Sequence, residues 1–307
     1  MINIIGKRYW YFIFSAIIIV AGIVAMIIFP LKLGVEFQSG SELTAQFASN
    51  VTKEEIAQAL SELGYKSGQV VIRAAGSDFI IDLPQLNDAQ QAELRTGLTA
   101  KLGDYSDKGI QLVSPATAST TTRNAIIAVI ISAIGMLLYI TWAFHRMPNP
   151  FRWGTAAIIA MVHDILVSLG IFAILAAINS WRVDLLLITA ILTVVGYSVN
   201  DTIVIFDRIR ENVRRFPGVD FELLVNNSLA ETMGRSLNTV LTTLFSIVAL
   251  LLFVGSALNN FVIILLVGIA SGAYSSICTA APILVVWDKG EWGRFIGRKP
   301  KPVIAAR

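Results

Sequence analysis

Long stretches of apolar residues, separated by short polar connections, make up most of this 307-residue chain. Each stretch holds about 20 residues or more, the length that a helix needs to cross about 30 Å of hydrocarbon. We predict six transmembrane helices, over residues 9–29, 125–144, 155–178, 185–206, 237–258 and 261–286. The first stretch follows Lys7 and Arg8 but is too long for a cleaved signal peptide, so we expect it to remain as an anchor.

Residues 31–123 show a different pattern, with short alternating segments and most of the acidic residues. Alternation of apolar and polar residues predicts strands over 43–47, 70–72, 79–81 and 110–113. Thr52 and Asn87 are N-cap residues before two helices, and Glu55 completes a capping box with Thr52. The order β-α-β-β-α-β is that of the ferredoxin-like split βαβ motif. We therefore predict a membrane α-helical protein, with six transmembrane helices and one extracytoplasmic α+β ferredoxin-like domain between helices one and two.

Positive charges orient these predicted helices. Lys and Arg follow the second, fourth and sixth apolar stretches, whereas the opposite connections nearly lack them, which places both termini in the cytoplasm and residues 31–123 outside. Residues 216–234 predict a helix at the interface or under the bundle. The chain then has four parts: 1–30, the N-terminal segment and first transmembrane helix; 31–123, the extracytoplasmic α+β domain; 124–288, a five-helix membrane bundle with a cytoplasmic loop at 207–235; and 289–307, a basic cytoplasmic tail.

Composition narrows the class of protein further. Charged residues make up 15% of the chain, whereas a soluble domain carries about 25%. The slight positive excess gathers at the ends of apolar stretches, so it does not indicate nucleic-acid binding. Cys278 is the only cysteine, which excludes a disulfide within the chain and suggests no thiol metal site. Because phosphate loops, metal-binding spacings and nucleophile elbows are absent from the sequence, we expect no enzyme activity, cofactor or metal.

An acidic residue inside the fourth apolar stretch is the main candidate for chemistry. Asp201 lies in the cytoplasmic half of that predicted helix, where a charged side chain costs about 2.5–3.5 kcal/mol on insertion scales. Such a residue is rare without a partner or a task, so Asp201 is a candidate proton relay. Ser198 and Arg208 share its helix face, whereas Asn200 is turned by about 100°. The alternative is that Asp201 forms a fixed ion pair that joins two helices.

Other polar residues lie at similar depths. Asp164 is near the middle of the third predicted helix beside His163, and Arg235 begins the fifth from the cytoplasmic side. Arg235 and Asp201 are both in the inner half, so their depths permit a contact in which the guanidinium favours the charged carboxylate and burial opposes it. The candidate proton-relay residues are Asp201, Arg235, Asp164 and Asn200. As alternatives, Asp164 and His163 form a structural hydrogen bond, and Arg235 extends to the inner interface.

Small residues recur along the sixth apolar stretch. Gly268, Gly272, Ser276 and Ala280 follow at four-residue spacing, and Ser271, Ser275 and Thr279 form a second small face. In lipid, small faces let helices approach closely. We interpret both faces as packing surfaces within the bundle or against a partner subunit, not as a site.

Several motifs together resemble those of the SecD/SecF family of the bacterial Sec protein translocase. Residues 195–202, Val-Gly-Tyr-Ser-Val-Asn-Asp-Thr, continue into Phe-Asp-Arg-Ile-Arg-Glu-Asn at 206–212, and both resemble the fourth-helix signature of the SecF branch. His163-Asp164-Ile165, Gly-Val-Glu-Phe-Gln-Ser-Gly at 34–40 and Arg-Ser-Leu-Asn-Thr at 235–239 are similar to shorter family motifs. At 34–40, Glu36 stands where the family has Asp, and Ser39 replaces the first of two glycines.

The resemblance implies a resistance–nodulation–division type of membrane part and a heterodimer with SecD. It implies an accessory subunit in the bacterial cytoplasmic membrane that uses the proton motive force to promote export of unfolded proteins after the SecA motor step. Implied partners are SecD, the SecYEG channel, SecA, the YidC complex, unfolded preprotein and membrane lipid, with no nucleic acid. Asp201 and Arg235 match the family's proton-pathway positions. Two alternatives stay open: a passive scaffold that stabilises SecD and the channel, and an exporter of small molecules or lipids.

Overall fold

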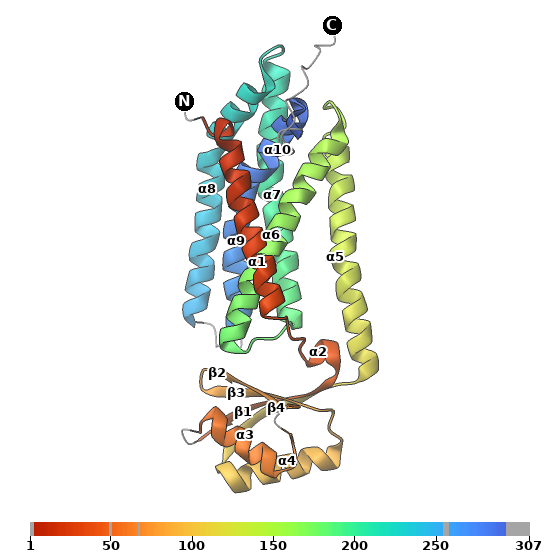
Figure 1. The fold of residues 1–307 in the computed structure, drawn as a ribbon, viewed down its shortest axis with the longest axis vertical. Helices are drawn as coiled ribbons and strands as arrows, with labels where there is room; N and C mark the ends of the chain where they lie inside the picture. Colours follow the sequence, from red (N-terminus) through yellow and green to blue (C-terminus); the bar gives the residue numbers. More distant parts are fainter. Residues whose placement is uncertain (1–2, 49–50, 67, 254–257, 293–307) are drawn as a thin grey trace.

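The computed structural model describes residues 3–48, 51–66, 68–253 and 258–292. In this part of the chain, six helices are long and apolar enough to cross a membrane, and a small α+β domain lies at one end of their bundle (Figure 1). The predicted fold class is therefore confirmed. The membrane helices are α1 (Arg8–Ile28), α5 (Pro115–Ala143), α6 (Pro150–Asn179), α7 (Leu185–Arg215), α8 (Phe221–Phe253) and a sixth span made of α9 (Asn259–Ser275), the π-helical segment η3 (Ser276–Ala280) and α10 (Ala281–Asp288).

The helix α5 extends well before the apolar stretch that predicted it. It begins at Pro115, whereas the sequence predicted a start at residue 125. The Ser114 hydroxyl caps it by accepting a hydrogen bond from the N–H of Thr117 at 3.1 Å, and proline at the first helical position has the required φ. The predicted domain boundary after residue 123 thus lies inside α5.

The predicted cytoplasmic loop 207–235 is mostly helical. Between α7 and α8 only residues 216–220 are non-helical, and they include Pro217 and Gly218, whose φ of 86° does not suit a helix. The helix predicted within 216–234 is the first part of α8, because the single Gly234 costs only about 1 kcal/mol in a helix and does not interrupt it. This part of α8 runs obliquely across the end of the bundle before the helix turns along it (Figure 1).

The α+β domain is a four-stranded antiparallel sheet with two helices on one face (Figure 1). The sheet order is β2-β3-β1-β4, and the chain order β1, α3, β2, β3, α4, β4 is the predicted ferredoxin-like one. Leu43 and Ile81 pair across β1 and β3 and pack in one core with Ile56 of α3 and Leu94 of α4. The elements are β1 (Gly40–Phe47), α3 (Lys53–Glu62), β2 (Val71–Ala75), β3 (Asp78–Leu83), α4 (Asp88–Leu102) and β4 (Tyr105–Val113).

Capping interactions start both helices of this domain as the sequence predicts. The Thr52 hydroxyl accepts from the N–H of Glu55 at 3.3 Å, and the Glu55 carboxylate accepts from the N–H of Thr52 at 2.7 Å. Asn87 and Gln90 form the equivalent pair at the start of α4. Local hydrogen bonds therefore place both helices independently of the rest of the fold.

The other face of the sheet is turned toward the bundle and carries charged residues. Strand alternation places Glu42 and Asp82 on this face, opposite the apolar core. Nη2 of Arg73 lies 2.7 Å from a Glu42 oxygen and 2.9 Å from Asp82 Oδ1. Nε of Arg182, from the connection between α6 and α7, lies 2.9 Å from Asp82 Oδ2. These four residues, the junction cluster, join the domain to the bundle.

Backbone pairing strengthens the same junction. The N–H of Gly34 donates to the carbonyl of Val183 at 2.8 Å, and the N–H of Val183 donates to the carbonyl of Lys32 at 2.8 Å. The charged groups here share a poorly hydrated space. Burial raises the pKa of Glu42 from 4.5 to about 7, the Arg73 guanidinium opposes this rise, and the neighbouring carboxylates add to it.

The centre of the bundle is formed by α6, α7 and the sixth span. In the most apolar 18-residue stretch of each helix, 50% is buried in α6 and in α7, against 6% in α5 and 17% in α8. The helices α1 and α6 cross at Gly22 and Gly170, where a Cβ on Gly170 would lie only 2.5 Å from the Gly22 Cα. The outward surfaces of α5 and α8 are therefore available for contacts outside this chain.

Candidate functional site in the membrane

Two acidic side chains lie inside the bundle, each on one of its central helices. Asp164 of α6 is fully buried, and Asp201 of α7 is 8% exposed. A polar group removed from water is stable only with hydrogen-bond partners. Hydroxyl groups from neighbouring helices supply these partners, and they differ between the two acids.

Asp164 is surrounded by hydrogen-bond donors. Its Oδ2 accepts from the Ser198 hydroxyl at 2.6 Å and from the Ser275 hydroxyl at 2.7 Å. Its Oδ1 accepts from the Ser271 hydroxyl at 2.7 Å and lies 3.0 Å from Nδ1 of His163. Four partners from α6, α7 and α9 match the acceptor capacity of a carboxylate. Asp164 thus ties together the three central helices.

The small residues of the sixth span serve this site as well as packing. A Cβ on Gly272 would lie 2.9 Å from the Ser198 Cβ, so glycine allows α9 to approach α7 closely. At this approach Ser271 and Ser275 reach Asp164. The interpretation of these serines as a packing surface and not a site is therefore corrected. The spacing did not reveal the hydroxyl contacts, because a serine that packs and a serine that donates are equally small.

Asp201 has fewer partners. Its Oδ1 accepts from the hydroxyl of Ser236 on α8 at 2.6 Å. Its Oδ2 is buried and makes no hydrogen bond of normal geometry with the residues that the structure describes, although the Ser276 hydroxyl is close enough to interact with the carboxylate. A buried carboxylate oxygen without a donor costs about 1–3 kcal/mol or more, and a bound proton lowers that cost because it removes the charge. Of the two acids, Asp201 is thus the better candidate to bind and release a proton.

Two further hydroxyls connect the surroundings of the two acids. The Thr202 and Ser276 hydroxyl oxygens lie 2.8 Å apart, and both donate to the carbonyl of Ser198, at 3.1 and 3.3 Å. Ser198 and Asp201 are three residues apart on one face of α7, as predicted. We call this set the intramembrane polar network; it comprises His163, Asp164, Ser198, Asp201, Thr202, Ser236, Ser271, Ser275 and Ser276.

Arg235 and Asn200 lie outside this network. Both side chains are exposed in the single chain, and the ion pairs formed by the described residues do not include one between Arg235 and Asp201. The contact that their depths permitted is therefore not made here. It is Ser236, the next residue along α8, that turns inward to Asp201. Arg235 borders a surface hollow of about 440 Å³ together with Arg208 and Glu231.

Arg235 begins a stripe of exposed polar residues along α8. The hydroxyls in it donate to carbonyls of their own helix, for example Thr239 to Arg235 at 2.9 Å and Thr242 to Asn238 at 3.0 Å. Polar side chains at membrane depth normally face protein or water and not lipid. The α8 stripe therefore suits contact with another membrane subunit. It consists of Arg235, Asn238, Thr239, Thr242 and Ser246.

The described residues contain no candidate metal-binding site. No group of three or more His, Cys, Asp or Glu side chains there is arranged to hold a metal ion. The cysteine, Cys278, is a free thiol that is partly buried in the sixth span. What the site offers is a set of hydroxyls and two carboxylates, which are suited to holding and passing protons.

The six spans, the ferredoxin-like domain and the buried acids define a multi-pass membrane protein with a polar site inside its bundle. Two family matches specify it further. The family described as "Protein export membrane protein SecD/SecF, C-terminal" matches residues 94–290, and the "SecD/SecF GG Motif" matches residues 24–51 despite the departures at Glu36 and Ser39. The chain belongs to the SecD/SecF family of protein-export membrane proteins.

Relatives match along the entire chain. The protein translocase subunit SecF of Thermobaculum terrenum is 40% identical over 100% of both chains. The protein translocase subunit SecDF of Bacillus subtilis is 37% identical over 93% of this chain, which spans 38% of that longer protein. The fold is also similar to the crystal structure of SecDF from Thermus thermophilus, which is described as a translocon-associated membrane protein. The two structures superpose with a TM-score of 0.84 at 30% sequence identity, over 94% of this chain and 38% of that one.

Proposed function

We propose that this chain works with a SecD subunit as an accessory of the Sec translocase, and that proton transfer at Asp201 drives it. Relatives named protein translocase subunit SecF support the first part. The observation that supports the second part is the buried Oδ2 of Asp201, which makes no hydrogen bond of normal geometry with the described residues, close to the hydroxyls of Ser236 and Ser276. In this proposal the chain is a non-enzymatic subunit, and the candidate relay residues are Asp201, Arg235, Asp164 and Asn200.

Protonation of Asp201 has a direct structural consequence in this proposal. The ionised carboxylate holds the Ser236 hydroxyl of α8, whereas a neutral acid holds it more weakly because charge-assisted hydrogen bonds are about twice as strong. Gain and loss of a proton therefore change the attachment of α8 to α7. A charge that crosses the membrane potential releases about 2.3 kcal/mol per 100 mV, which is enough to shift such an equilibrium.

The partner surface in this proposal is the α8 stripe together with Asn200. SecDF chains from Bacillus subtilis and Thermus thermophilus carry a segment similar to this chain within a longer protein, which supports association with SecD. A second membrane subunit at this surface would cover polar side chains that lipid cannot satisfy. It would also bring Arg235 from an exposed position into a protein interface one residue from Ser236.

The wider assembly follows from the same proposal. We place the chain in the bacterial cytoplasmic membrane with both ends of the chain inside and the 31–123 domain outside, as the basic residues at one end of the bundle favour. There it would act beside the SecYEG channel, SecA and the YidC complex. The domain would contact unfolded preprotein, and 207–235 and 289–307 would lie on the cytoplasmic side.

The test is protein export into vesicles that contain this chain, SecD, SecYEG and SecA, with and without a proton gradient. We expect Asp201→Asn to reduce the gradient-dependent part of export to the level of vesicles that lack the chain, because an amide cannot be ionised. The gradient-independent part should not change. The matched control is Asp207→Asn, an exposed acid on the same helix, which should retain full export.

Export by Asp201→Asn equal to that of the unchanged chain would remove Asp201 from the mechanism and leave the scaffold interpretation. Arg235→Ala provides a second arm of the same assay. Loss of gradient-dependent export with normal co-purification of SecD supports a relay role, whereas failed co-purification makes Arg235 a structural contact.

A further inference from the structure

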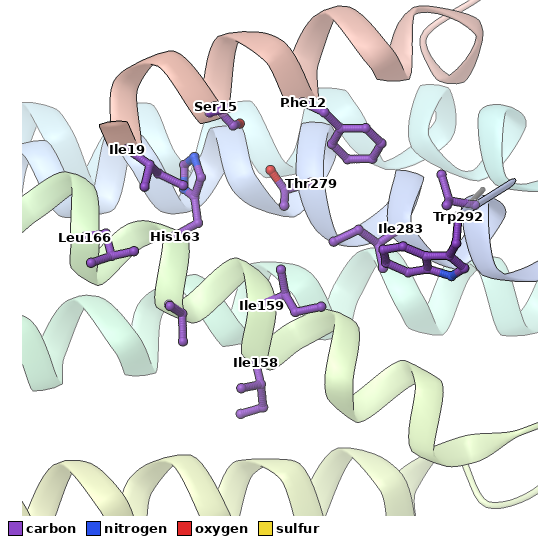
Figure 2. A pocket seen from close by; sticks show the side chains of 13 residues that line it. Phe12, Ser15, Ile19, Ile158, Ile159, His163, Leu166, Thr279, Ile283 and Trp292 are labelled. Atoms are coloured by element: carbon purple, nitrogen blue, oxygen red, sulfur yellow. The ribbon is translucent and has the colours of Figure 1, made fainter. Parts of the chain in front are cut away.

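An apolar cavity in the bundle lies on the opposite side of the His163 ring from Asp164. Between α1, α6 and the sixth span there is a cavity of about 440 Å³, within the range of about 300–1,000 Å³ that small-molecule pockets occupy (Figure 2). Its walls are almost wholly apolar. They include Phe12, Ile19, Ile159, Ile283 and Trp292.

Two buried polar atoms of residues that line this cavity lie directly behind its apolar wall and lack hydrogen-bond partners among the described residues. Nε2 of His163 and the hydroxyl oxygen of Thr279 make no hydrogen bond with any residue in the described ranges, although their side chains are only 4% and 5% exposed. Figure 2 shows His163 and Thr279 beside Ser15 in one part of the cavity, with Ile283 and Trp292 in another. Ser15 is already engaged, since its hydroxyl lies 3.3 Å from that of Tyr274.

The hydrogen-bonding chemistry of these two atoms specifies the missing group. Nδ1 of His163 lies 3.0 Å from the Asp164 carboxylate, which accepts, so in the neutral form of the ring the hydrogen is on Nδ1 and Nε2 is an acceptor. The Thr279 hydroxyl can donate as well as accept. A single group satisfies both atoms when it donates to Nε2 and accepts from Thr279. A hydroxyl does this, whereas an ether or a carbonyl only accepts and a hydrocarbon does neither.

We propose that this cavity binds an apolar molecule that carries one hydroxyl group, such as an alkylphenol or a long-chain alcohol. The hydroxyl lies between His163 and Thr279, and the apolar part fills the remaining space along α1 and α6. A saturated lipid chain fits the walls but leaves both polar atoms unpaired. The bound hydroxyl would be separated from Asp164 by a single imidazole ring, so the site borders the intramembrane polar network.

The test measures binding and does not depend on transport. The full chain, purified with SecD in lipid nanodiscs, is labelled with a photoactivatable alkylphenol, and three unlabelled competitors are compared: 4-nonylphenol, its methyl ether and nonylbenzene. We expect labelled peptides from α1, α6 or the sixth span. We also expect 4-nonylphenol to compete roughly 2- to 10-fold better than the other two, the range for one neutral hydrogen bond.

Variants locate the hydroxyl. Thr279→Val keeps the side-chain shape and should lower the affinity for 4-nonylphenol by a similar factor while leaving nonylbenzene unchanged. Ala16→Phe fills the cavity and should abolish labelling by the probe. Thr155→Val on α6, which does not line the cavity, is the matched control and should change nothing. Equal competition by all three compounds, labelling elsewhere, or no effect of Thr279→Val would overturn the proposal.

Discussion

At the scale of single residues, the two buried acids differ in how their oxygens are satisfied. Asp164 has four partners, so its carboxylate is a structural centre as well as a relay candidate. Asp201 has one partner on Oδ1 and, in the described structure, none on Oδ2. Removal of the Asp164 side chain should therefore lower the stability of the protein, whereas removal of the Asp201 side chain should impair the use of the proton gradient in export.

The residue-scale prediction concerns Asp164. We expect Asp164→Ala to lower the stability of the purified protein by on the order of 3 kcal/mol or more, because it leaves several buried donors without an acceptor at about 1–3 kcal/mol each. Thermal unfolding in detergent measures the change, with Asp201→Asn as the comparison that should unfold near the unchanged protein. If Asp164→Ala unfolds at the same temperature as the unchanged protein, its four contacts are not a structural centre.

At the scale of helices, the sixth span organises the site. Its first part places Ser271 and Ser275 against Asp164, and the π-helical segment that follows carries Ser276 toward Thr202 and Thr279 toward the cavity. A π-helical turn rotates the residues after it relative to a regular α-helix, and such turns are frequent at functional sites. Close contact with α7 at Gly272 is what brings these hydroxyls within reach.

The helix-scale prediction is that Gly272→Leu separates α9 from α7. The new side chain would overlap Ser198, so we expect a loss of stability of about 1–3 kcal/mol, the range for overpacked interiors, together with loss of gradient-dependent export. Gly135→Leu on α5 is the control, since a Cβ there meets no atom within 4 Å. Unchanged unfolding temperature and export for Gly272→Leu would show that this close approach is dispensable.

At the scale of the whole molecule, the α+β domain is attached to the bundle by charged groups and backbone hydrogen bonds. The junction cluster connects the sheet, through Asp82, to Arg182 of the connection between α6 and α7. Those two helices carry Asp164 and Asp201. A displacement of α6 against α7 would therefore move the connection that holds the outer domain.

This arrangement predicts a pH dependence of the junction. Because burial raises the pKa of Glu42 from 4.5 to about 7, the folded protein binds a proton more tightly than the unfolded chain does. Its contribution to stability is therefore present below about pH 4.5 and is lost as the pH rises through about 7. Arg73, Asp82, Arg182 and Glu36 are the charged groups around it.

The measurement compares Glu42→Gln with the unchanged protein by thermal unfolding at pH 5 and pH 8. Glutamine cannot ionise, so the unchanged protein should lose more stability than the variant between these two pH values. The difference between the two proteins isolates Glu42 from other groups that titrate. An identical pH dependence in both proteins, or a greater loss in the variant, would contradict the raised pKa.

Local patterns in the sequence specify the helices and strands of this protein. The apolar stretches predicted the six spans, because crossing the membrane requires length and composition that are local to each segment. Alternation and the caps at Thr52 and Asn87 predicted the outer domain, since capping depends on residues three positions apart. Asp164 and Asp201 were visible for the same reason, as acids inside apolar stretches.

The groups that contact those two acids depend on how the helices pack in three dimensions. Ser271 lies 107 residues from Asp164 in the chain. At Asp201 the partner is Ser236 of α8, and not Arg235, for which a similar depth in the membrane had predicted a contact. The cavity beside His163 likewise arises from three separate spans. Helix rotation and close approach set these contacts, and both result from packing among residues far apart in the chain, which a local pattern does not encode.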